Sequence, residues 1–89
     1  MIDISSYNVI TELDLKCLRV VYDHGKLING GIVASVFIPV GSDSEGVAVM
    51  EDLEWFGFVR NGKYLGKRRA SCVITEKCVK YFEEKALAG

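Results

Sequence analysis

The sequence is poor in several residue types, and each shortage excludes a class of protein. Its 89 residues include one histidine, one proline and three cysteines, with no Cys-x-x-Cys pair. An odd number of cysteines argues against a disulfide framework, and their spacing does not suit a four-ligand zinc site. His24 and Cys17 are seven residues apart on one predicted helix, too far for a catalytic pair. We expect no metal, no cofactor and no enzymatic activity.

Two kinds of segment are also missing. Residues 1–10 lack a basic start followed by an apolar run, so we expect no secretory signal. The longest uncharged stretch, residues 27–42, is interrupted by three glycines and Pro39 and is too short to span a bilayer. These features predict one domain over residues 1–89, in a reducing, cytoplasmic compartment and without membrane contact.

Charge is distributed unevenly along the chain. The net charge is −1, but residues 1–59 carry nine acidic and three basic side chains, whereas residues 60–89 carry three acidic and eight basic ones. Such a polarised chain favours an anionic partner for its basic part or association between oppositely charged surfaces of two copies.

Local patterns predict helices first and a hairpin later. Thr11, followed by two acids, predicts the start of a helix that ends near Asp23. Residues 27–40 suit either a short buried helix or a buried strand, and we favour a helix from about residue 30 to residue 37. Pro39 ends this element in either case.

The remaining elements follow a clearer pattern. A helix over residues 43–56 is capped by Asp43 or Ser44, and Gly57 lies just past its end. Two strands follow, over residues 58–65 and 70–74. The last helix covers residues 75–86, and its inner face carries Cys78, Val79, Phe82 and Ala86. The turn between the strands falls either at Asn61-Gly62 or at residues 66–69. We favour the second, because it places the basic residues on a solvated tip.

Three segments, Ile10–Leu18, Met50–Val59 and Arg69–Lys77, resemble the first helix, the end of the recognition helix and the second wing strand of MarR-like winged helix-turn-helix regulators. The resemblance implies an α+β winged helix with a three-helix core, a two-stranded β-hairpin wing and a C-terminal helix. It also implies binding of double-stranded DNA, with the recognition helix in the major groove and the wing on the backbone or minor groove.

The expected wing carries five bases within ten residues: Arg60, Lys63, Lys67, Arg68 and Arg69. These residues are the candidates for phosphate contact, although a run of bases can also be a solvated hairpin tip. On the expected recognition helix, Ser42, Ser44 and Ala48 would lie nearest to the bases of DNA. That helix holds five acids and no base, which opposes its entry into a groove.

A second hypothesis is a winged helix that binds protein instead of DNA. Val47, Glu51 and Trp55 lie at i, i+4 and i+8, and together with Asp52 they form an aromatic, acidic face suited to a basic protein or the wing of a second copy. Trp55 could equally cover the edge of the core. A homodimer through the last helix is a further expectation, with Tyr81 at the contact.

Overall fold

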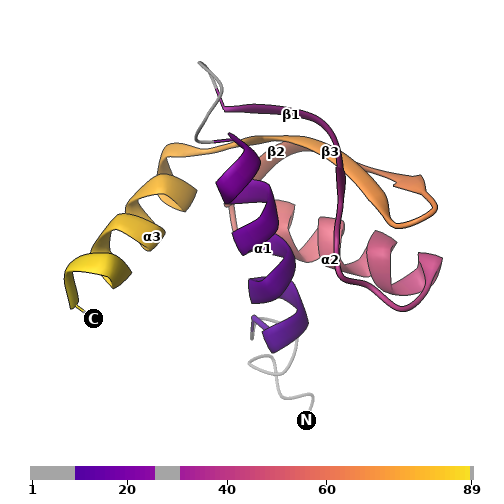
Figure 1. The fold of residues 1–89 in the computed structure, drawn as a ribbon, viewed down its shortest axis with the longest axis horizontal. Coiled ribbons are helices and arrows are strands. Elements are labelled where there is room, and N and C mark those ends of the chain that lie inside the picture. The colour runs from indigo at the N-terminus through magenta and orange to yellow at the C-terminus, as the bar shows by residue number, and fades with distance from the viewer. Residues whose placement is uncertain (1–9, 26–30, 89) are drawn as a thin grey trace, which may run out of the picture.

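The fold is an α+β structure built on a small antiparallel sheet. The computed structural model describes residues 10–25 and 31–88. Its elements follow the order α-β-α-β-β-α (Figure 1): α1 Glu12–Gly25, β1 Ile32–Phe37, α2 Asp43–Trp55, β2 Val59–Gly66, β3 Arg69–Ile74 and α3 Glu76–Ala88. The expected α+β class, the hairpin and the C-terminal helix are therefore confirmed.

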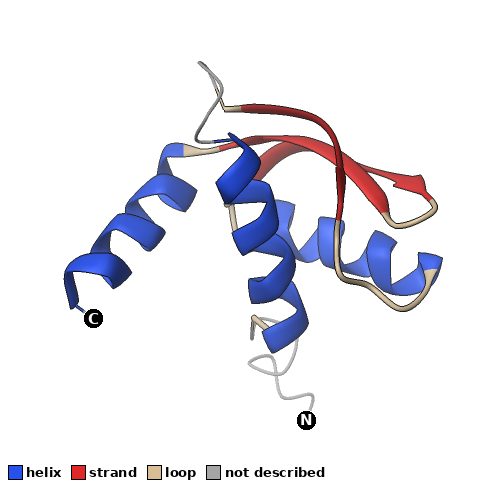
Figure 2. Ribbon diagram, in the orientation of Figure 1, coloured by secondary structure: helices blue, strands red, loops and turns tan. Residues whose placement is uncertain are grey.

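The sheet has the strand order β1-β3-β2, and β3 pairs antiparallel with both neighbours. Alternate residues of β3, namely Ala70, Cys72 and Ile74, are buried, because side chains of a strand point in turn to opposite faces. Figure 2 shows α1 and α2 on one face of the sheet. No described helix covers the other face.

The core lies between this sheet and the two helices. Its most deeply buried members include Leu18 and Val21 of α1, Leu53 of α2, and Val59 of β2. The three cysteines are also buried and free, and their burial raises the pKa of the Cys72 thiol to about 11. They act as small apolar side chains, as expected.

The favoured helix over residues 30–37 is wrong: residues 32–37 form β1, and Gly30 lies outside the described residues. Val33 and Val36 are both buried, with an irregularity in the β3 pairing between them, so their spacing of three imitates a helical period. A single helix, α2, therefore lies between β1 and β2. The order departs from the three-helix core of a winged helix.

The helix termini follow local rules. Thr11 Oγ1 accepts a hydrogen bond from the Asp14 N–H at 3.0 Å, and Asp14 Oδ2 accepts one from the Thr11 N–H at 3.2 Å, which is a capping box. The cap of α2 is Ser42, whose Oγ accepts from the Glu45 N–H, so the expectation of Asp43 or Ser44 is wrong by one or two positions. Gly57 lies just past the end of α2 with φ +81°, as predicted.

The last helix, α3, begins behind Thr75, whose Oγ1 accepts from the Cys78 N–H. It packs through Phe82, stacked on Tyr22 with ring centroids 4.4 Å apart. Ala86 is exposed, so its expected place on the inner face is wrong. None of the three described helices is long and apolar enough to cross a membrane.

Substitution of Gly46 tests the contact between α2 and β2. A Cβ added to this buried glycine would lie 2.1 Å from Cε1 of Tyr64, so Gly46→Ala should lower the free energy of unfolding by about 2 kcal/mol through overpacking. Denaturation in urea measures the loss. Val47→Ala, a change at the exposed neighbouring position, should stay close to wild type, and equal stability of the two variants would contradict the packing described.

Candidate nucleic-acid interface

The tip of the β2–β3 hairpin presents two of the five predicted bases. The turn consists of Lys67 and Arg68, with φ of 55° and 65°, and both side chains are exposed. Two central residues with positive φ define a type I′ turn, the geometry that fits the twist of a two-residue hairpin. The preferred turn position is thus confirmed, and the two cations project from a narrow tip.

Tyr64 connects this tip to the start of α2. Its hydroxyl donates to Asp43 Oδ1 at 2.8 Å and accepts from the Arg68 N–H at 2.9 Å. The ring fits against α2 because Gly46 has no side chain. Desolvation and the bond to Asp43 raise the pKa of Tyr64. The phenol therefore fixes both the shape of the turn and the distance between the turn and α2.

The other three predicted bases lie along the strands. Arg60 and Lys63 are exposed on β2, opposite Val73 and Ser71 of β3. The guanidinium carbon of Arg69 lies 4.0 Å from the centroid of the Phe37 ring. Arg69 Nη1 also donates to Ser35 Oγ at 3.4 Å.

The five bases are thus divided between the hairpin tip and the face of the sheet that α1 and α2 leave open.

At the start of α2, the residues predicted to lie nearest to the bases of DNA are next to carboxylates. Ser42, Ser44 and Ala48 are exposed, and so are Asp43 and Glu45 beside them. The Ser42 hydroxyl is already used as the helix cap. This surface therefore offers little hydrogen-bonding capacity to a base edge and a negative potential to a phosphate.

Trp55 lies on the outer face of α2, with 65% of its surface exposed, and Val47 is 46% exposed on the same helix. The ring touches Phe56 edge-on, with centroids 5.2 Å apart. Glu51 and Glu54 border a depression beside it. The alternative that Trp55 covers the core is wrong, because a covering side chain would be largely buried.

Asp52 does not belong to this outer face. It is half-buried and hydrogen-bonded to Asp14, so the two carboxyl groups meet between α1 and α2. Burial, and then the contacts with Asp14, raise the pKa of Asp52 to about 6. The expected role of Asp52 in the acidic face is corrected accordingly: its side chain turns toward α1.

Tyr81, expected at a contact between copies, packs within its own chain. It is half-buried, and its ring meets Phe58 at a centroid distance of 5.4 Å in an edge-to-face arrangement. The same ring borders a groove between α1 and α3, which is also lined by Leu15 and Arg19. Tyr81 therefore packs within its own chain and also lines a surface groove.

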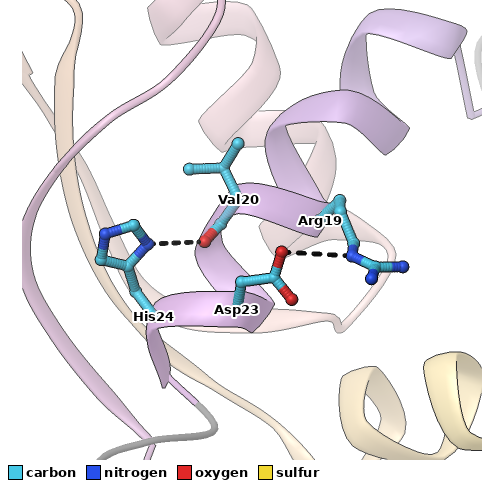
Figure 3. Close-up of polar contacts among 4 residues, drawn as sticks. All are labelled: Arg19, Val20, Asp23 and His24. Atoms are coloured by element: carbon cyan, nitrogen blue, oxygen red, sulfur yellow. Dashed lines mark hydrogen bonds and ion pairs between the residues drawn. The ribbon is translucent and has the colours of Figure 1, made fainter.

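His24 and Cys17, weighed above as a catalytic pair, have separate surroundings in the structure. Nδ1 of His24 lies 3.0 Å from the Val20 carbonyl oxygen, and an Arg19–Asp23 ion pair of 3.2 Å lies beside it (Figure 3). His24 thus contacts a backbone carbonyl of its own helix. Burial raises the pKa of the Cys17 thiol to about 11, so it stays protonated at neutral pH. Residues 10–25 and 31–88 contain no cluster of side chains that could hold a metal ion.

Comparison with protein families, with curated protein sequences and with solved structures finds no match to this chain.

Sequence reasoning missed Ile32, Ser35, Phe37 and Tyr64. Regular alternation along a strand over residues 32–37 would place Ile32 and Phe37 on opposite faces. Only the irregularity between Val33 and Val36 brings both to the open face, and the sequence pattern did not reveal it. The bond between Tyr64 and Asp43 spans 21 residues, and no local pattern contains it.

Neutralising Asp52 tests the carboxyl pair. The pKa of Asp52 in the fold lies above its ordinary value, so its contribution to stability is complete at acid pH and is lost as the pH rises through about 6. Asp52→Asn should therefore raise the free energy of unfolding at pH 7.5 by on the order of 1 kcal/mol, a value reduced for solvent screening. The gain should shrink toward pH 5.

The measurement is urea denaturation at several pH values. Glu54→Gln, a change at an exposed position of the same helix, serves as the control and should leave the pH profile unchanged. A wild-type stability that rises between pH 5 and 7.5 through this pair would contradict the assignment.

Proposed function

We propose that this protein is a small DNA-binding regulator that contacts double-stranded DNA mainly through the phosphates, with the β2–β3 hairpin in the role of a wing. The observation that carries the proposal is the exposure of Lys67 and Arg68 on a two-residue turn whose backbone is held by Tyr64. A rigid, cationic tip loses little entropy when it meets a phosphate backbone, and each neutralised phosphate releases counterions.

The chemistry of α2 limits how such a duplex would lie. Carboxylates on its exposed side repel phosphates, so α2 would not enter the major groove as a recognition helix does. The hairpin would instead lead the contact, with Ser42 and Ser44 close to the DNA only near the tip. Phosphate contacts carry affinity without sequence information, and the proposed binding is accordingly of low sequence specificity.

A homodimer belongs to the same proposal. The groove beside Tyr81 and the exposed Leu87 near the end of α3 are the surfaces that would meet. Two copies joined through α3 would present two hairpins to one duplex, which multiplies weak affinities through effective concentration.

A second candidate function is protein binding through the outer face of α2. Its support is the 65% exposure of Trp55 beside Val47 and two exposed carboxylates, Glu51 and Glu54. Aromatic anchors surrounded by charge are typical of interaction hot spots. The partner would be a basic protein or the basic hairpin of a second copy.

Removing the three consecutive bases of the hairpin tests the first function. In the variant Lys67→Asn/Arg68→Gly/Arg69→Gln, the turn keeps residues that favour positive φ, so the charge is lost without damage to the hairpin. We expect this variant either to lose binding to a random-sequence duplex or to show a slope of log affinity against log salt that is smaller by about three. Fluorescence anisotropy at about 50 and 200 mM salt measures both the affinity and its salt dependence.

The control removes two bases elsewhere, Lys77→Gln/Lys80→Gln, and is compared with the two-base hairpin variant Lys67→Asn/Arg68→Gly, which has the same net charge. It should keep most of the affinity, because both lysines lie on α3, away from the hairpin and outside the groove between α1 and α3. An equal loss of affinity in both variants would contradict the proposal that the hairpin leads the contact. The absence of binding by the wild-type protein at low salt would contradict it as well.

The second function predicts that Trp55→Ala abolishes a complex while the fold is retained. Light scattering would report self-association, and pull-down with a basic peptide would report a foreign partner. Leu87→Ala distinguishes the two surfaces, because it should weaken a homodimer formed through α3 and should leave a complex formed through α2 unchanged. An unchanged complex in Trp55→Ala would exclude the α2 face.

A further inference from the structure

The open face of the sheet has a composition unlike the rest of the molecule. The strands β1, β2 and β3 contain no aspartate or glutamate, although the chain as a whole is slightly acidic. Arg69 alternates with the buried residues of β3. Arg60 and Lys63 pair with Val73 and Ser71 on that same side of β3, because an irregularity lies between them. The open face is thus cationic, and among the carboxylates of α2 it is Glu54 that reaches its border.

Apolar and cationic side chains occupy different edges of this face. Ile32 pairs with Val73, and Val73 pairs in turn with Arg60, so one row crosses the sheet from an apolar to a charged residue. On the apolar edge, Ile32 and Phe37 of β1 are 54% and 57% exposed. With neighbouring strands about 4.8 Å apart, the edge strands β1 and β2 are separated by about 10 Å.

The ring of Phe37 is exposed and already contacts a cationic side chain. The Arg69 guanidinium lies 4.0 Å from the ring centroid, and its bond to Ser35 keeps both groups on the same part of the face. Aromatic rings and arginine planes are the two protein surfaces on which unpaired bases stack. A guanidinium already placed beside the ring also puts a positive charge next to any stacked base.

We propose that the open face binds an unpaired nucleic-acid strand, with bases against Phe37 and Ile32 on β1 and phosphates against Arg60 and Lys63 on β2. The width of the sheet matches this division, since a phosphate and the far edge of its base are separated by a similar distance. The inference rests on the proposed function only in taking nucleic acid as the ligand.

An unpaired strand fits this face better than a duplex does. In a duplex the base faces are hidden by stacking, so Phe37 and Ile32 would meet only sugars and phosphates and would stay without an apolar partner. A hollow across the strands, lined by Ile32, Lys63 and Ser71, continues the face toward β2. Glu54 of α2 borders that hollow, and its carboxylate would oppose a phosphate there.

The test compares the affinity for a mixed-sequence strand of about 12 nucleotides, as DNA and as RNA, with that for the corresponding DNA duplex. Fluorescence anisotropy at one salt concentration gives all three affinities. Phe37→Ala should weaken binding of the strand about tenfold and leave duplex binding unchanged. Phe37→Trp, which keeps an aromatic ring, should retain the wild-type affinity for the strand. Glu54→Gln should tighten it.

Val47→Ala is the matched control, because Val47 has a similar exposure on α2, and it should change neither affinity. Tighter binding of RNA or of DNA identifies the source of the strand. Duplex binding without strand binding would overturn this inference and leave the proposed function in place, whereas loss of both would overturn both. Self-association abolished by Phe37→Ala, without affinity for either strand, would assign the face to a second copy and also overturn the inference.

Discussion

The pairing of β3 with strands on both sides is the interaction on which the other features depend. A strand in this position must send alternate side chains to opposite faces, and its sequence does so with small and apolar residues on one side. Ala70, Cys72 and Ile74 meet the helices, whereas Arg69, Ser71 and Val73 are left on the other side. The sheet therefore has a packed face and an open face, and the helices can occupy only one of them.

This division also sorts the charges. The bases of the hairpin and strands belong to the sheet layer, and most carboxylates of α2 point away from it. The bond from Tyr64 to Asp43 crosses between the layers and orders the hairpin tip against the start of α2. Nucleic acid would therefore approach from the sheet side, and Trp55 would remain accessible on the other. The two candidate functions use different surfaces and do not compete for one.

The interior holds three thiols and one carboxyl group away from solvent. Its thiols are buried, which raises the pKa of Cys78 to about 12 and keeps the sulfur protonated. The one polar side chain buried among apolar residues that the structure describes, Asp14, is held by the cap at Thr11 and by Asp52. Both proposed functions draw instead on surface charge, exposed rings and the shape of the hairpin.

The sequence by itself determined the helices, the turn at Lys67 and Arg68, the stop at Gly57 and the uneven charge, because caps, turns and periodic burial are local properties of the chain. It could not decide between helix and strand at residues 32–37, since two valines three apart suit both. Only the tertiary structure decided it, because the free edge of β3 needs a partner for its backbone groups. The same long-range pairing brought Phe37 to Arg69 and turned Asp52 toward Asp14. These contacts join segments about 30 residues or more apart, and no local pattern encodes them.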